Sequence, residues 1–103
     1  MLKHCVFVNL KEDVDEEARE AVLSGFGTLV GEIDGMLDYC QGPNLDFEAK
    51  SPDYSWGFIV TFRDRTAHLA YEQHPRHKEL GAKLVAMCKG GHDGILVFDL
   101  QTD

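Results

Sequence analysis

The sequence has no apolar run near the roughly 20 residues that a membrane-spanning helix needs, and its amino terminus lacks the basic-then-apolar pattern of a secretory signal. Positive charge is also scarce, because 10 Lys and Arg residues stand against 18 Asp and Glu, a net charge of −8 at pH 7. Such a charge repels nucleic acid and anionic membrane surfaces. We therefore expect a cytoplasmic protein that binds neither nucleic acid nor membranes.

Cysteine is sparse as well, with three residues and no Cys-x-x-Cys pair. Cys5, Cys40 and Cys88 are scattered within apolar patterns, which favours free buried thiols over a disulfide framework. A chain of 103 residues is long enough for one hydrophobic core but not for two. No repeat, linker or low-complexity segment divides it, so residues 1–103 are expected to form a single domain.

Four segments carry the apolar patterns of β-strands: residues 2–10, 36–41, 54–63 and 95–100. Helical spacing predicts a first helix that Asp15 caps and Gly35 ends, followed later by helices over residues 66–71 and 75–88. The resulting order is that of the ferredoxin-like split βαβ fold. We therefore predict an α+β domain with a four-stranded, antiparallel-containing sheet and helices on one of its faces.

The other sheet face is predicted to have no helix to cover it. Strand alternation places the following apolar side chains there: Cys5, Phe7, Ile59, Leu96 and Phe98. In a monomer this patch would be too large to leave in water. The simplest solution is a two-fold homodimer in which two such faces close on one another.

The run Tyr-Glu-Gln-His-Pro-Arg-His over residues 71–77 predicts a corner between two helices. Pro75 pushes His74 out of the α region but is well suited to open the next helix. His77 then lies in the first turn of that helix, on the inward face that continues through Leu84. Tyr71, at the end of the preceding helix, can point into the same space.

Three stretches together give the chain a resemblance to a known family. They are the first strand Lys-His-Cys-Val-Phe-Val, the Tyr-x-x-His-Pro-x-His corner at residues 71–77 and the closing Val-Phe-Asp at residues 97–99. With them the chain resembles the stress-responsive dimeric α+β barrel (Dabb) family over nearly its whole length. The resemblance implies a homodimer of ferredoxin-like subunits, each with a cleft between sheet and helices. That family includes plant and bacterial proteins linked to stress, and some members that cyclise polyketide chains by aldol-type condensation.

The resemblance also implies site residues. It places a functional histidine on His4, a phenol on Tyr71 and the principal histidine on His77, with Asp99 near the cleft. Cyclising members can have a second strand histidine where this chain has Trp56, which removes a polar group and fills space. We expect a small apolar or aromatic molecule in the cleft, and the residues expected to contact it are Val6, Trp56, Phe58, Leu84, Val97 and Asp99.

The residue types suggest a chemistry for such a site. The positive end of a helix disfavours the imidazolium, so His77 is expected to be a neutral base that removes a proton alpha to a carbonyl. Tyr71 would donate to the carbonyl oxygen, and Asp99 would hold the imidazole of His77 in the required tautomer. In the simpler interpretation, Tyr71 and His77 only bond backbone groups at the corner, and His4 is a satisfied core histidine.

A metal site has less support. His74 and His77 are spaced closely enough to share an ion, but only His4 or Asp99 would supplement them toward the three or four ligands required. We expect neither a metal nor another cofactor, and we expect His74 to cap the helix that follows it.

Two other histidines and one long loop complete the expectations. His68 and His92 are expected to be exposed and without a role. Residues 42–53 form the longest irregular stretch and hold two of the three prolines. Long loops in compact domains often cover sites.

Three functions fit these features. The first is a lyase or cyclase acting on a small oxygenated apolar molecule, with His77 as base and Tyr71 as donor. The second is a non-enzymatic stress or binding protein whose dimer is the functional unit. The third is a cofactor-free or haem-degrading monooxygenase of a related barrel type. Trp56 and His77 fit that type loosely, but the asparagine it requires is missing because Asn9 lies on the opposite strand face from His4.

Overall fold

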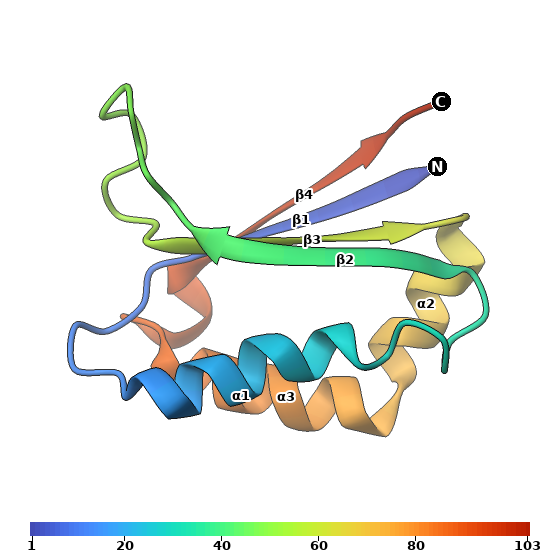
Figure 1. The fold of residues 1–103 in the computed structure, drawn as a ribbon, viewed down its shortest axis with the longest axis horizontal. Helices are drawn as coiled ribbons and strands as arrows, with labels where there is room; N and C mark the ends of the chain where they lie inside the picture. Colours follow the sequence, from blue (N-terminus) through green and yellow to red (C-terminus); the bar gives the residue numbers. More distant parts are fainter.

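The computed structural model describes residues 1–103, whose four strands form one sheet with the helices on one side of it (Figure 1). The elements in chain order are β1 (Leu2–Val8), α1 (Glu16–Gly27), β2 (Met36–Pro43), β3 (Trp56–Phe62), α2 (Arg65–Gln73), α3 (Pro75–Met87), the short 3-10 helix η1 (Gly91–Gly94) and β4 (Ile95–Gln101). The strands lie in the order β2-β3-β1-β4, and each neighbouring pair is antiparallel. The predicted ferredoxin-like split βαβ fold is confirmed.

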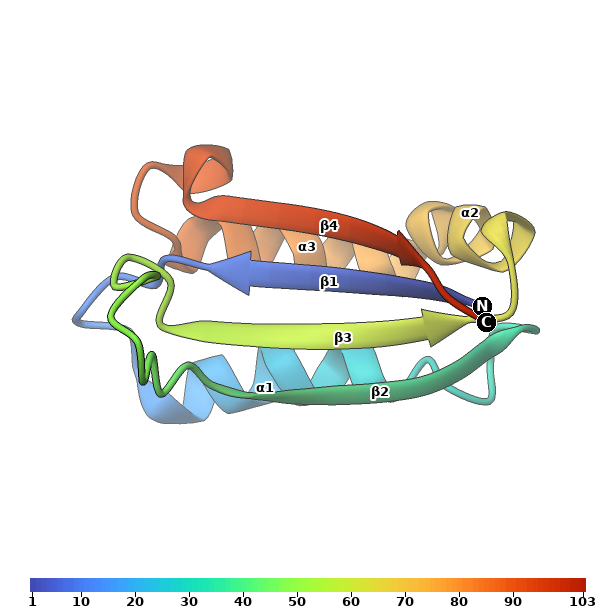
Figure 2. The same ribbon diagram turned by 90° about the horizontal axis from the view of Figure 1, so that it is seen from above.

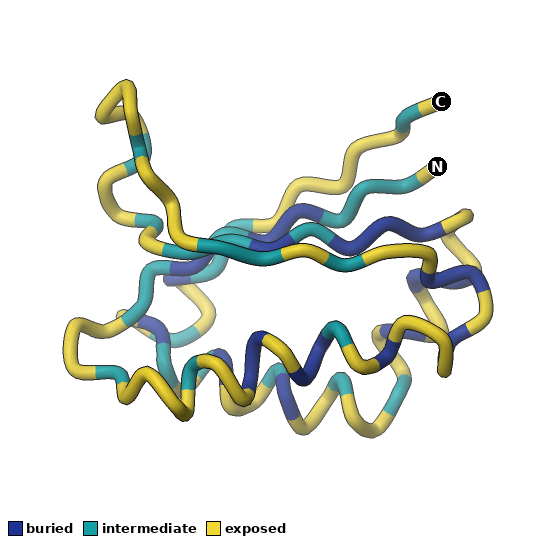
Figure 3. Tube along the Cα trace, viewed as in Figure 1, coloured by how far each residue is buried: buried dark blue, intermediate teal, exposed yellow.

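The hydrophobic core fills the layer between the sheet and the helices. Helices α1 and α3 run along the sheet, whereas α2 lies at one end of it (Figure 2). Alternate residues of β3, namely Phe58, Val60 and Phe62, point into this layer and are almost fully buried. Phe26 of α1 stacks on Phe58 with 5.1 Å between the ring centroids. Burial thus follows the inner side of each element, as Figure 3 shows.

The first helix is shorter than its apolar spacing predicts, because α1 ends at Gly27 and Thr28 caps it. Leu29 and Ile33 are nevertheless buried, since the turns that follow α1 continue to fill the core. The expectation that Gly35 ends this helix was therefore wrong. Gly35 precedes β2 with φ +85°, and a Cβ atom there would lie 2.7 Å from that of Ala67.

The predicted corner between α2 and α3 is present, and side chains cap both helices. The Asp64 carboxylate accepts a hydrogen bond from the Ala67 amide at 3.0 Å and so opens α2. His74 ends α2 in an extended conformation, and its Nδ1 accepts from the Arg76 amide at 3.1 Å. Pro75 occupies the first turn of α3. The caps hold the end of α2 and the start of α3 against the end of the sheet.

The opposite sheet face carries no helix and is apolar. Phe7, Ile59, Leu96 and Phe98 line a hollow of about 470 Å³ on this face. Phe7 and Phe98 meet edge to face at 6.0 Å between centroids, and Phe98 remains 52% exposed. We refer to this surface as the free face.

The three cysteines differ in burial. Cys5 and Cys88 are buried, but Cys40 is exposed, contrary to expectation, because the outward side of β2 has nothing packed on it. All three cysteines are free.

None of the helices combines the length and the apolar character that crossing a bilayer requires.

The cap of α2 yields a test of the corner. We expect Asp64→Ala to lower the free energy of unfolding by about 1 kcal/mol, because the Ala67 amide loses its partner at the helix start. Urea denaturation measures this change. Asp53→Ala is the matched control, since Asp53 is an exposed aspartate outside any helix. An equal effect of the two substitutions would contradict the capping role.

Candidate functional site

A cavity of about 740 Å³ lies between the sheet and α3, on the helical side of the molecule. Its walls are mostly apolar side chains of β1, β3, β4, α1 and α3. Seven of the residues expected at a site line it: His4, Val6, Phe58, Tyr71, His77, Leu84 and Val97. Ligand cavities in proteins are commonly of this size and combine apolar walls with a few polar groups.

Two residues expected at the site are not part of its lining. Trp56 lies at the edge of the core, where its Nε1 donates to Gln41 Oε1 at 2.6 Å and the Arg19 guanidinium covers its ring at 4.2 Å. Asp99 is also outside the cavity wall, although it contacts a residue that lines it. Trp56 therefore belongs to a separate polar cluster, and Asp99 acts on the cavity only indirectly.

Tyr71 and His77 meet at the corner between α2 and α3, with 4.2 Å between their ring centroids. Tyr71 is 1% exposed. Its hydroxyl oxygen and Nδ1 of His77 are both buried without a hydrogen-bond partner. The simpler interpretation, in which these atoms bond the backbone, therefore does not describe the hydroxyl or this nitrogen. Unpaired buried polar atoms are uncommon and costly, and they mark a place where a further group can bind.

Burial sets the protonation of both side chains. It lowers the pKa of His77 from its usual 6.5, and the nearby backbone of Glu72 opposes this shift more weakly. The predicted direction is thus correct, but its main cause is burial, whereas the sequence interpretation invoked the helix end. Burial also raises the pKa of Tyr71 well above its usual 10. At neutral pH the corner therefore presents a neutral imidazole next to a protonated phenol.

His4 is held by Asp99, which the sequence had assigned to His77. The two residues face each other directly across β1 and β4, and His4 Nδ1 lies 2.6 Å from Asp99 Oδ1. A carboxylate only accepts, so this nitrogen carries the proton of the hydrogen bond. The His4 ring lies 6.0 Å from that of Tyr71. Asp99 therefore orients His4 on β1 and is not the hydrogen-bond partner of His77 on α3.

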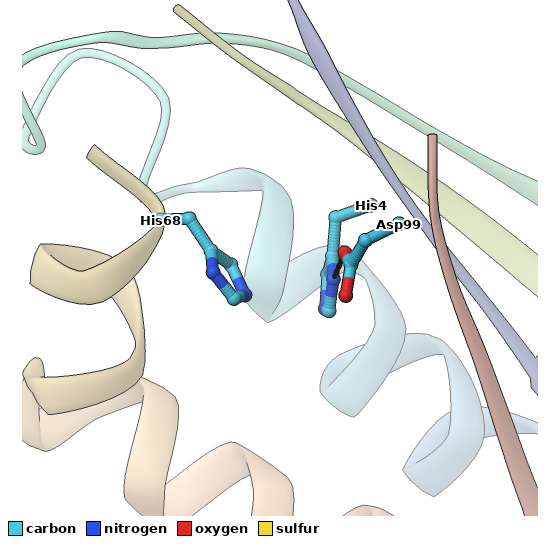
Figure 4. Close-up of side chains that lie close together, drawn as sticks. All are labelled: His4, His68 and Asp99. Carbon is cyan, nitrogen blue, oxygen red and sulfur yellow. Dashed lines mark hydrogen bonds and ion pairs between the residues drawn. The ribbon is translucent and has the colours of Figure 1, made fainter. Parts of the chain in front are cut away.

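His68 corrects a second expectation, because it is 2% exposed and lies beside His4. Figure 4 shows it extending from α2 toward His4 and Asp99, and the two imidazole centroids are 4.7 Å apart. Arg65 Nη1 donates to His68 Nδ1 at 2.6 Å. Its Nε2 is buried without a hydrogen bond, although Glu72 Oε1 lies 3.1 Å away. Burial lowers the pKa of this imidazole as well.

His4, His68 and Asp99 have the composition of a metal site, with one donor atom from each within 4.8 Å of the others. The hydrogen bonds argue against that use. Arg65 is a donor only, so His68 accepts at Nδ1 and carries its proton on Nε2. Neither nitrogen of His68 then offers a lone pair to a cation. Within the cluster, Asp99 hydrogen-bonds His4, and the His68 ring packs beside that of His4.

The other expected residues lie apart from this cluster. His74 caps α3, as predicted, and its Nε2 is 3.6 Å from Glu32. His92 is exposed, as predicted, but it reaches the rim of the cavity. The long loop between β2 and β3 does not cover the cavity, because its side chains border the free face.

Several lining residues were not singled out from the sequence. Phe26, Val85 and Ile95 form apolar wall, and Glu72 and Lys78 stand at its polar border. Phe26 and Ile95 follow the apolar periods of their elements, which predict burial but do not distinguish a packed core position from a cavity wall.

The chain is similar in sequence to proteins of one family. A family model described as the stress responsive A/B barrel domain matches residues 2–102. A stress-response A/B barrel domain-containing protein of Arabidopsis thaliana is 31% identical over 88 residues, which cover 82% of this chain and 75% of that protein.

Solved structures share the fold. A dimeric ferredoxin-like protein from Jannaschia sp. CCS1 has a TM-score of 0.85 at 39% identity, with 98% of each chain covered. The hydroxynitrile lyase of Passiflora edulis has a TM-score of 0.82, with 99% of this chain and 93% of the lyase covered. Its identity is 16%, so this second likeness shows the fold alone.

The buried histidines predict how stability depends on pH. Because burial lowers the pKa of His68 and His77, the unfolded chain binds protons near pH 6.5 that the folded chain does not yet bind. The free energy of unfolding should therefore fall as the pH drops from 7 toward about 5, above the range in which carboxylates titrate. Urea denaturation across this range measures the slope.

Single substitutions identify the groups responsible. His77→Gln should give a shallower pH slope than the wild type, whereas the exposed His92→Gln should leave the slope unchanged. Equal slopes for wild type and His77→Gln would show that His77 is not held neutral by burial.

Proposed function

This chain belongs to the stress responsive A/B barrel domain family, and on that basis we propose that it is a homodimer whose cavity binds a small, mostly apolar molecule with a carbonyl oxygen. We further propose that His77 and Tyr71 transfer protons to and from this molecule, as in a lyase or cyclase. The observation that carries the proposal is the pair of unpaired polar atoms, Tyr71 Oη and His77 Nδ1, buried beside one apolar cavity.

The unpaired atoms favour an oxygenated ligand over a pure hydrocarbon. A buried polar group without a partner costs about 1–3 kcal/mol, which a bound oxygen atom recovers. The walls from Val6, Phe58 and Leu84 bury the carbon skeleton, and the polar atoms at the corner fix where the oxygen lies. The cavity thus selects both an apolar body and a hydrogen-bonding oxygen.

The protonation states divide the chemical roles between the two side chains. His77, neutral because it is buried, accepts a proton from the carbon alpha to the carbonyl. Tyr71, kept protonated by burial, donates to the carbonyl oxygen as negative charge develops there. His4 supplies a second nitrogen at the cavity wall, and Asp99 fixes its tautomer. This is the proton-abstraction step of an aldol-type lyase or cyclase.

A non-enzymatic binding protein is the second candidate, and one observation favours it. No carboxylate orients the His77 imidazole, because Asp99 is bonded to His4. A base that no carboxylate orients is a weaker catalyst but an adequate hydrogen-bonding group for a ligand. Turnover of a linear triketone, followed by the absorbance of its aromatic product, separates the two candidates.

The monooxygenase alternative has lost its support. It needs a tryptophan next to the site histidine, and Trp56 is outside the cavity that His77 lines. Asn9 lies at the end of β1, where its backbone pairs with Gly94. The chain therefore does not gather the residues on which that function depends.

The homodimer is supported by the free face. Phe7, Ile59 and Phe98 form an apolar surface that no helix of the same chain covers. The Jannaschia protein, 39% identical over almost the whole chain, is described as dimeric. Two free faces closing on one another would remove both surfaces from water in a single isologous interface.

Substitutions at the corner test the site. We expect His77→Ala to abolish turnover of the triketone and to weaken binding of acetophenone, a simple aromatic ketone, measured by calorimetry. Tyr71→Phe should slow turnover about a hundredfold by removing the donor to the developing charge. Its free energy of unfolding should not fall, because the hydroxyl has no partner to lose.

The matched control is Tyr54→Phe, which removes a phenol outside this cavity. Unchanged acetophenone binding in both corner variants would remove the site. Binding lost without any triketone turnover by the wild type would select the non-enzymatic candidate.

The dimer has its own test. Phe98→Asp should raise the dimer dissociation constant more than about tenfold, because an unpaired charge would be buried between the sheets. Sedimentation equilibrium measures the constant, and Leu69→Asp on the exposed side of α2 is the control. A wild-type protein that stays monomeric at micromolar concentration would refute the dimer.

A further inference from the structure

The loop that joins β2 and β3, residues 44–55, has a position that the site does not explain. It rises from the end of the sheet on the side away from the helices, which is the side of the free face (Figure 1). Asn44, Ser51 and Tyr54 of the loop line the same hollow as Phe7 and Phe98 of the sheet. The loop and the free face therefore form one continuous surface. We refer to residues 44–55 as the arm.

The arm exposes the two most accessible large apolar side chains in the chain. Phe47 is 90% exposed and Leu45 is 67% exposed, whereas Phe98 on the free face is 52% exposed. Two large apolar side chains that are this exposed on one loop indicate an interaction surface. Because they stand on the side of the free face, a body that covers this face lies within their reach.

Internal hydrogen bonds hold the arm in shape. Asp46 Oδ1 accepts from the amides of Lys50 and Ser51 at 3.0 and 2.9 Å. Asn44 Nδ2 donates to Ser51 Oγ at 2.9 Å and to the Tyr54 carbonyl oxygen at 2.8 Å. The backbone also takes positive φ at Asp46 and Ala49. The apolar tip is thus presented by an ordered loop, which reduces the entropy lost on binding.

The outline of the free face can be compared with the area that stable dimers bury. Three strands of seven residues and one of eight, spaced about 4.8 Å apart and rising about 3.3 Å per residue, outline a flat area of roughly 460 Å². A stable interface buries about 800 Å² on each partner. A second contact from each copy would enlarge the interface beyond the sheet outline, and two-fold symmetry would supply this contact twice.

We propose that the arm clasps the second copy of this chain, with Phe47 and Leu45 packing on it beyond the edge of the paired sheets. This inference rests on the homodimer proposed above. It assigns the arm a role in assembly and leaves the cavity on the helical side accessible to its ligand.

The test is sedimentation equilibrium on the wild type and on the double variant Leu45→Ser, Phe47→Ser. The double variant should raise the dimer dissociation constant at least about tenfold with an unchanged far-ultraviolet circular dichroism spectrum, because both side chains are exposed in the single chain. Phe47→Leu should keep most of the affinity. Leu69→Ser, which removes a partly exposed leucine from α2, should leave the constant unchanged.

The outcomes separate the two proposals. A wild type that dimerises and a double variant that dimerises equally well would overturn the arm while leaving the homodimer intact. A wild type that is monomeric would overturn the homodimer and the arm with it. Equal weakening by Leu69→Ser would also overturn the arm, since the effect would not be specific to its tip.

Discussion

The structure depends on one constraint, which is that a single four-stranded sheet has two apolar faces and this chain has helices for only one. Helices α1 and α3 cover the inner face and create the core around Phe26 and Phe58. Space left between β4 and α3 becomes the cavity. The outer face, with Phe7 and Phe98, has no helix of this chain on it. The proposed ligand site and the proposed assembly surface therefore lie on opposite sides of one sheet, so neither has to be disrupted to form the other.

The corner at Pro75 turns this architecture into a candidate site. It ends one helix and starts the next within a single residue, so Tyr71 and His77 come from different helices yet have rings 4.2 Å apart. Tyr71 Oη and His77 Nδ1 are both buried without a partner, in residues that line the cavity. Behind the site, a row of polar contacts runs from Arg65 through His68 and His4 to Asp99. Arg65 donates to His68, the His68 ring lies beside that of His4, and Asp99 accepts from His4. Two of the buried polar atoms without a hydrogen-bond partner, Tyr71 Oη and His77 Nδ1, lie at the corner, and a third, His68 Nε2, lies behind it.

The elements and the corner were predictable because local rules determine them. Alternation in β3 and the Pro75 junction needed no knowledge of the rest of the chain. The tautomer partner was not predictable, because His4 and Asp99 meet only through the register of β1 with β4, which alternation alone does not specify. His68 was a missed signal, since it lies three residues before Tyr71 and so shares its inward side of α2. The predicted length of α1 was wrong for a different reason. Leu29 and Ile33 continue the helical spacing of apolar residues and are buried, but they lie in the turns that follow the helix.

The central claim is that the buried polar pair at the corner receives the oxygen of an apolar ligand. A crystal structure of the protein soaked with acetophenone tests it most directly. The account predicts density for the aromatic ring among Val6, Phe58 and Leu84, with the ketone oxygen about 2.5–3.0 Å from the Tyr71 hydroxyl. A cavity that holds only water hydrogen-bonded to Tyr71 and His77, with the ketone elsewhere or nowhere, would contradict it.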